Sequence, residues 1–247
     1  LSNTDYNSVQ NYLLQQHTQN VKAATATLSS GVRDPNGLLS FFPAAAPWCP
    51  YGAAFYVNAS PGISNPPYTV TKFSNEWNTT MHDVYNHPEN CVLDGEYIDS
   101  FGAAATVADY SSNHLRTTTL PPTYTRDNST LMTPLIFGTF EMARAIGADV
   151  HALGKPIIAN TVFAPWPRLP LGIGLFDFAG AEINCFDAAG SFVPPSDDSL
   201  LYARALSGVR PYGYLLNTDF TKVSSAEMED RKSTSLNSSH ELPSRMP

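Results

Sequence analysis

Charged residues are scarce in this sequence of 247 amino acids, and long apolar runs are missing. Asp, Glu, Lys and Arg together make up 15% of the chain, against about a quarter in an average globular protein. This excludes a coiled coil and a charged disordered chain. No stretch approaches the roughly 18–20 consecutive apolar residues of a membrane-spanning helix. Because 43% of the residues are hydrophobic, we expect a globular protein with a sizeable core and no membrane span.

Cysteine is rare, and positive charge is in deficit. Cys49, Cys91 and Cys185 have no C-x-x-C spacing, which disfavours a zinc ribbon or a thioredoxin-like motif. Three cysteines permit at most one internal disulfide. The 14 Lys and Arg against 22 Asp and Glu give a net charge of −8, with a pI near 5.1. This charge argues against binding to the phosphate backbone of a nucleic acid.

The common cofactor and nucleophile motifs are also missing. No G-x-G-x-x-G follows an expected strand, since the nearest match, Gly172-Ile-Gly174, precedes one, and there is no P-loop. No G-x-S-x-G elbow is present for Ser/His/Asp hydrolysis. His82 and His87, with the carboxylates beside them, are five residues apart in a proline-containing segment, which is poor ligand geometry. We therefore expect no cofactor and no metal.

The two ends of the sequence do not read as natural ends. The sequence begins at Leu1 with no visible secretory signal, which is also expected if the N-terminus is missing. Residues 230–247 (DRKSTSLNSSHELPSRMP) have no apolar periodicity and resemble the translated read-through of a sequencing-library adapter. We expect a partial domain over residues 1–229 and a non-native tail after it. The body of the chain has three N-x-S/T sequons, at Asn58, Asn78 and Asn128, which favour a secreted protein, whereas a fourth, at Asn237, lies in the expected tail and is set aside.

Five short apolar runs in the body of the chain each end in a polar residue. Runs of four to eight mostly apolar residues are typical of strands that are covered on both faces. Helices are expected over Asp5–Ser30, Thr133–Leu153 and Ser196–Ser207, and from Ser224 onward. The five runs are Gly52–Asn58, Gly95–Asp99, Lys155–Asn160, Gly174–Glu182 and Gly213–Asn217.

Strands that alternate with helices indicate an α/β fold with a parallel sheet. The two candidates are an open doubly wound sheet and a (β/α)8 TIM barrel. The missing glycine-rich phosphate loop disfavours the first. The barrel is favoured, because long loops after its strands would account for residues 59–90 and 101–132. We expect a truncated barrel with long βα loops.

Two carboxylates, Asp99 and Glu182, end the second and fourth runs. In a βα barrel the carboxyl ends of the strands converge on the active site, and a glycosidase needs two carboxylates there. Asp177 is an alternative to Glu182 as the acid. Further polar and aromatic residues are expected to bind the substrate, and buried structural roles are the alternative for each: Asn58, Asn160, Asn217, Asp219, Trp48 and Trp166.

Four stretches resemble barrel glycoside hydrolases: LDGEYIDS (93–100), GKPIIANT (154–161), FDFAGAEIN (176–184) and YLLNTDF (214–220). The similarity covers roughly residues 30–229 and is greatest to poorly characterised relatives of the retaining α-glycosidases, including the endo-α-N-acetylgalactosaminidases. Its best motif is D-G-x-Y-x-D-S. The resemblance implies that Asp99 is the nucleophile at the end of strand four and Glu182 the acid/base at the end of strand six. Strands one, two and eight would then be missing. The α-galactosidase clan commonly has Asp in both roles, so Glu182 departs from that pattern.

The expected function is retaining hydrolysis of an O-glycosidic bond in an oligo- or polysaccharide. Because a barrel that lacks strands exposes sheet edges and part of its core, activity is expected of the full-length protein. A catalytically inactive, secreted carbohydrate-binding barrel is the alternative. An oxidoreductase or an aldolase on the same scaffold is a third, because fold does not fix function. No lysine ends a run, which argues against a Schiff-base aldolase.

Overall fold

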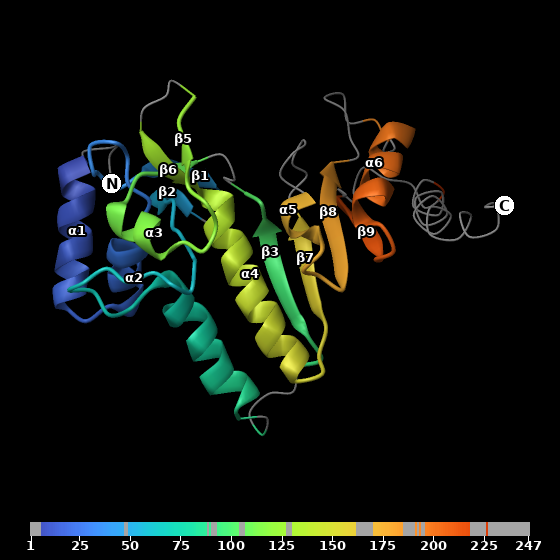
Figure 1. The fold of residues 1–247 in the computed structure, drawn as a ribbon, viewed down its shortest axis with the longest axis horizontal. Coiled ribbons are helices and arrows are strands. Elements are labelled where there is room, and N and C mark those ends of the chain that lie inside the picture. Colours follow the sequence, from blue (N-terminus) through green and yellow to red (C-terminus); the bar gives the residue numbers. More distant parts are fainter. Residues whose placement is uncertain are drawn as a thin grey trace. The chain divides into compact units, whose positions relative to one another are not determined.

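The structure is a computed structural model that describes residues 6–46, 49–87, 89, 93–103, 107–126, 130–161, 170–184, 191, 193, 196–217 and 226. Its contacts divide the chain into two compact units. Unit 1 comprises Leu1–Leu93 and Ala104–Asp149, and unit 2 comprises Asp94–Ala103 and Val150–Pro247. Figure 1 shows the elements of both units along the chain. The expected tail, residues 230–247, lies outside the described residues, as does the helix expected from Ser224 apart from residue 226.

Unit 1 begins with two helices, α1 (Tyr6–Thr18) and α2 (Lys22–Ser30). The expected single helix over Asp5–Ser30 is therefore wrong. The chain breaks at Asn20, whose φ of 60° lies in the left-handed region, where the short polar side chain of Asn is tolerated better than most. Leu13 and Leu28 from the two helices share a buried apolar cluster with Leu39.

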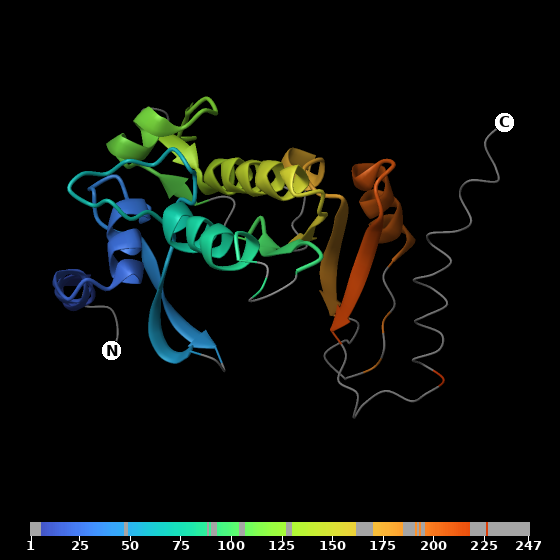
Figure 2. The same ribbon diagram turned by 90° about the horizontal axis from the view of Figure 1, so that it is seen from below.

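A β-hairpin follows, made of β1 (Phe41–Ala46) and β2 (Cys49–Phe55). The two strands form an antiparallel pair (Figure 2). In its register Phe41 is opposite Phe55. The run Gly52–Asn58 was expected to be a strand of the parallel sheet, and that expectation is wrong. Two strands separated by only two residues can pair only antiparallel, because a parallel pair needs a crossover of a dozen or more residues.

The rest of unit 1 contains short elements and one long helix. The helix α4 (Leu135–Ala152) lies where Thr133–Leu153 was expected, but Thr133 and Pro134 end a strand instead of starting the helix. Gly154 follows it with φ of 70°, as expected of a glycine after a helix. The short elements are the π-helices η1 (Ser74–Asn78) and η2 (Met81–Tyr85), the helix α3 (Ser112–Thr117), and an antiparallel sheet in the order β4 (Ala108–Asp109), β6 (Leu131–Pro134), β5 (Thr123–Tyr124).

Unit 2 is built on a four-stranded parallel sheet, drawn as arrows from green to red in Figure 1. Four of the five apolar runs form these strands, which confirms them as parallel strands. The spatial order follows the chain: β3 (Glu96–Phe101), β7 (Ile157–Thr161), β8 (Phe178–Asn184) and β9 (Tyr212–Asn217). Two helices join them, α5 (Pro170–Ile173) and α6 (Asp197–Ser207). Ser196 caps α6 by accepting a hydrogen bond from Ser199 N, as the sequence predicts.

The order of these strands bears on the choice between the two α/β folds. A doubly wound sheet reverses its strand order at a switch point, and the four described strands show no reversal. They form an open sheet, so the closed (β/α)8 barrel stays a prediction. None of the helices in the described ranges combines the length and apolar character needed to cross a bilayer.

The two faces of the sheet differ in burial. One face is covered and carries Ile98, Ile157, Ala159, Ala179 and Ala181, all of them buried. The other, which we call the open face, carries Tyr97 on β3, Ile158 on β7 and Phe178 on β8. Tyr97 is 53% exposed and Phe178 is 38% exposed. Alternation of side chains along a strand assigns the residues to these two faces.

Candidate functional site

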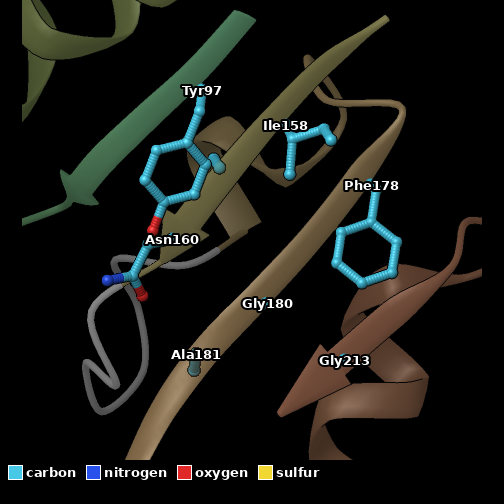
Figure 3. A pocket seen from close by; sticks show the side chains of 8 residues that line it. Tyr97, Ile158, Asn160, Phe178, Gly180, Ala181 and Gly213 are labelled. Atoms are coloured by element: carbon cyan, nitrogen blue, oxygen red, sulfur yellow. The ribbon is translucent and has the colours of Figure 1, made fainter. Parts of the chain in front are cut away.

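A pocket of about 300 Å³ lies on the open face of the unit 2 sheet. Figure 3 shows Tyr97 and Phe178 at its two sides, with Ile158 between them and Asn160 toward the carboxyl end of β7. The lining is mainly apolar, and its glycines are Gly180 and Gly213. A mostly apolar concavity with a few polar groups is the usual form of a small-molecule site, so we take this pocket as the candidate site.

Asp99 lies near the end of β3 and is hydrogen-bonded by three side chains. Asn160 Nδ2 donates to Asp99 Oδ1 at 2.8 Å, and Tyr97 OH donates to the same oxygen at 3.4 Å. Ser100 Oγ donates to Asp99 Oδ2 at 3.2 Å. The Asn160 hydrogen bond is the largest influence and lowers the pKa of Asp99. Burial is the next largest and raises it, but the hydrogen bonds from the Ser100 side chain and backbone and from Tyr97 also lower the pKa, so the net shift is downward. Asp99 is therefore an ionised carboxylate at neutral pH.

An irregularity in β3 sets the position of Asp99. The pairing of β3 with β7 shifts register between Ile98 and Phe101, and Ser100 has φ of 54°, in the left-handed region. Phe101 then returns to the covered side, where its ring contacts Phe176 edge-on at 4.9 Å. Such bulges re-aim side chains and are common beside active sites. Here the bulge keeps Asp99 exposed at the carboxyl edge while Phe101 stays in the core.

Asn160 links Asp99 to the pocket. It lies on β7 in register with Gly180 of β8, is 6% exposed and lines the pocket. The next residue, Thr161, donates its hydroxyl to the Gly180 carbonyl at 2.7 Å. The structure therefore brings together two of the residues that the sequence selected, Asp99 and Asn160, at the carboxyl ends of adjacent strands.

The remaining candidates are described less fully. Glu182 lies on β8 two residues beyond Gly180 and pairs with Leu215 of β9. Asn217 ends β9 opposite Asn184. For both residues only the backbone is described. Three more candidates lie outside the described residues: Trp48, Trp166 and Asp219.

Asn58 has a buried place in unit 1 instead of a place in the parallel sheet. It is 2% exposed, donates Nδ2 to Asp109 Oδ2 at 3.1 Å and accepts from Ser60 N at 3.1 Å. A Cβ added at Gly138 would lie 2.0 Å from its Oδ1, so the space around it is filled. Its substrate-binding role was argued from its place at the end of a parallel strand, and that placement is wrong. Its burial also makes this sequon inaccessible in the folded chain.

Asp177, the alternative acid, lies at the amino ends of the strands. Its Oδ2 is 2.8 Å from His151 Nε2 and accepts from Ile157 N at 2.9 Å. Partial burial alone would raise the pKa of Asp177, but the hydrogen bonds from His151 and Ile157, with the charges of His151 and Arg210, outweigh it and lower the pKa. These contacts hold Asp177 at the start of β7 and β8, at the opposite end of β7 from Asn160.

The sequence analysis missed Tyr97, Phe178 and Gly213 as site residues. The signal was available for two of them, because each lies on the same strand as a predicted residue and at an even spacing from it. Tyr97 is two residues before Asp99 and Phe178 is four before Glu182, and positions two or four apart in a strand share a face. For Gly213 the signal was weaker, because a glycine at the start of a run also reads as a turn.

His82 and His87 do come close together, with ring centroids 5.5 Å apart. Each Nδ1 is hydrogen-bonded to a carboxylate, His82 to Asp83 at 2.7 Å and His87 to Glu89 at 3.0 Å. Within the part of the chain that the structure describes, no group of three or more His, Cys, Asp or Glu side chains could hold a metal ion.

Comparisons with known proteins do not extend this description. No family model matches the chain, and no curated protein or solved structure is similar to it.

Proposed function

We propose that the chain is part of a (β/α)8-barrel glycoside hydrolase that cleaves an O-glycosidic bond in an oligo- or polysaccharide with retention of configuration. The observation that carries the proposal is the Asp99 carboxylate, held ionised by Asn160, Ser100 and Tyr97 at the carboxyl edge of a parallel sheet, beside an apolar pocket. The sequential order of the four strands supports the barrel.

In the proposed mechanism Asp99 is the nucleophile. Its Oδ1 accepts hydrogen bonds from Asn160 and Tyr97, whereas Oδ2 accepts one from Ser100. Because Oδ2 has fewer side-chain donors than Oδ1, we assign the attack on the anomeric carbon to Oδ2. A C–O bond forms between Oδ2 and that carbon while the bond to the leaving oxygen breaks, and a covalent glycosyl-enzyme results.

Glu182 is the proposed acid/base. It protonates the leaving oxygen in the first step and removes a proton from the attacking water in the second, which releases Asp99 and the sugar. Asp99 and Glu182 are two strands apart in the sheet, and Glu182 is about two residues further along the strand direction. This spacing separates their Cα atoms by about 12 Å. The mechanism requires the carboxyl groups to lean toward each other until they are about 5–5.5 Å apart, the separation of retaining enzymes.

The test is substitution of Asp99 in the full-length protein, which serves as the parent in all the comparisons below, with turnover of a panel of 4-nitrophenyl glycosides as the readout. Asp99→Asn should lower kcat by several orders of magnitude, and added azide should restore product formation as a glycosyl azide, because the small anion replaces the carboxylate. The matched control is Asp177→Asn, which changes the same residue type at the opposite end of the same sheet and should leave kcat close to that of the parent. Unchanged turnover in Asp99→Asn would remove Asp99 as the nucleophile.

A second substitution tests the acid. Glu182→Gln should slow the cleavage of alkyl glycosides far more than that of 4-nitrophenyl glycosides, because nitrophenolate leaves without protonation. An equal loss on both substrates would count against Glu182 as the acid.

The exposed aromatic side chains also fit the alternative function, a carbohydrate-binding barrel without catalysis. Sugar binding without turnover in the parent protein would favour it. Secretion is part of either proposal, and Asn78, which is exposed at the end of η1, could carry a glycan, whereas Asn58 could not.

A further inference from the structure

The open face of the sheet combines two exposed rings with two adjacent glycines. Gly180 and Gly213 are in register on β8 and β9. Glycine weakens a strand interior and often marks a place where a ligand or another backbone comes close. The backbone of β9 does come close, since a Cβ at Gly180 would lie 2.8 Å from the Gly213 carbonyl oxygen. Because neither Gly180 nor Gly213 has a side chain, the backbone of β8 and β9 is uncovered by their own side chains on the open face at this point, and we call it the glycine strip.

The ring of Phe178 lies over this strip. The three atoms nearest to a Cβ added at Gly213 all belong to the Phe178 ring: Cζ at 2.7 Å, Cε1 at 3.5 Å and Cε2 at 3.7 Å. The ring thus rests on β9 only because residue 213 has no side chain. Figure 3 shows the ring beside Gly213, at the edge of the pocket. Because Phe178 remains 38% exposed, the ring keeps accessible surface toward the pocket.

The polar groups are on the other side of the same pocket. Asn160 is in register with Gly180 and donates to Asp99, and the hydroxyl of Tyr97 donates to Asp99 as well. A ligand here meets the Phe178 ring on one side and Asn160 and Tyr97 on the other, and both of these residues are hydrogen-bonded to the Asp99 carboxylate. A pyranose ring has this division, with C–H groups on its faces and hydroxyl groups at its edge. The volume of about 300 Å³ is at the small end of ligand sites, which suits one sugar ring.

We propose that Phe178, seated over Gly213, is the platform on which the sugar ring next to Asp99 packs, and that Gly213 determines binding by positioning this ring. The inference rests on the proposed glycosidase function for the identity of the ligand. Phe178 makes no bond to the reacting atoms, so its contribution is to affinity and orientation.

The test separates binding from turnover. Binding of methyl glycosides is measured by saturation-transfer NMR and titration calorimetry in the Asp99→Asn variant, where the sugar is not consumed. Phe178→Ala in that background should weaken binding about tenfold or more, equal to about 1.4 kcal/mol. Gly213→Ala should weaken binding in the same direction, because the new Cβ displaces the ring. Gly174→Ala is the matched control, because a Cβ there meets nothing within 4 Å, and it should bind like the parent.

Thermal unfolding of each variant shows whether the fold is kept. Phe178→Tyr keeps an aromatic ring over the two glycines and should bind the sugar like the parent, so it serves as the second variant if Phe178→Ala does not fold. Parent-like binding by Phe178→Ala and Gly213→Ala overturns the platform, as does the absence of sugar binding by the parent. Sugar binding that depends on Phe178, in a protein that hydrolyses no glycoside, refutes the proposed catalysis and leaves the platform intact. Glycoside hydrolysis by the parent, with a KM that is unchanged in Phe178→Ala, supports the proposed catalysis and refutes the platform.

Discussion

The largest effect on stability is expected from a buried pair in unit 1, His114 on α3 and Asp109 on β4. His114 Nδ1 is 2.6 Å from Asp109 Oδ2, and the two side chains are 1% and 0% exposed. His114 Nε2 donates to the Ser29 carbonyl at 2.9 Å, because a carbonyl oxygen can only accept. The same pair of residue types occurs on the surface, where His82 Nδ1 lies 2.7 Å from Asp83 Oδ1 with side chains 74% and 62% exposed. The two pairs differ in burial far more than in distance.

Burial decides the magnitude. Asp109 also accepts from the backbone N–H groups of Arg33 and Ser111 and from Asn58 Nδ2, so its removal leaves several buried donors without a partner. Breaking a buried pair by removing one partner costs about 3–5 kcal/mol. An exposed pair is worth about 0–1 kcal/mol. Because a domain is stable by only about 5–15 kcal/mol, His114→Ala or Asp109→Ala removes a large part of the stability of unit 1.

A double-mutant cycle measures the difference. The single and double alanine variants of His114 and Asp109 are compared with those of His82 and Asp83 by urea unfolding, followed by circular dichroism and tryptophan fluorescence. With a slope of about 2 kcal/mol/M, a cost of about 4 kcal/mol moves the midpoint by about 2 M. The coupling energy should be about 2–3 kcal/mol for the buried pair and close to zero for the exposed one. Equal coupling energies in the two cycles would refute the argument from burial.

Two further variants give predictions of definite sign. The pKa of Asp177 is lower in the folded chain than its ordinary value of 3.8, so the stability that its ionised form contributes is fully present above that value and is lost as the pH falls through the folded pKa. The difference in unfolding free energy between the parent and Asp177→Asn should therefore shrink as the pH falls below about 4, and a difference that grows in this acid range would contradict the prediction. Gly138→Ala should lower the free energy of unfolding, measured in urea, by about 1–3 kcal/mol, because the new Cβ would meet the Asn58 amide. This loss outweighs the higher helix propensity of alanine, which favours the variant by about 1 kcal/mol. A more stable variant would show that Asn58 can move.

Local sequence patterns predicted the elements of unit 2 better than those of unit 1. The runs that became β3, β7, β8 and β9 are short, apolar and separated by long connections, which is the pattern of parallel strands. The run Gly52–Asn58 has the same composition but pairs with the proline-rich segment just before it. An apolar run indicates a strand and carries no information about its partner, so the hairpin could not be distinguished from a fifth parallel strand.

The candidate site was predictable to the extent that it follows strand ends. Asp99 and Asn160 end adjacent strands and do meet. The buried pair of His114 and Asp109 was not predictable, because its partners are on elements far apart in the chain, and Ser29 is 85 residues from His114. Asn58 resembles Asn160 in the sequence, since both follow an apolar run, and only the pairing of the strands distinguishes their environments.

The departures from local rules gather at one place in unit 2. Ser100 has a left-handed backbone that costs a non-glycine residue about 1–3 kcal/mol, Gly180 and Gly213 weaken strand interiors, and Tyr97 leaves much of its ring exposed. All of them lie on the open face or at the carboxyl edge of β3, whereas the opposite end of the sheet has the Asp177–His151 pair and a glycine-terminated helix, as local rules favour. Proteins break such rules mainly at functional sites. The same four residues surround Asp99 and the pocket, so this distribution supports the carboxyl edge as the working end of the sheet independently of any resemblance in sequence.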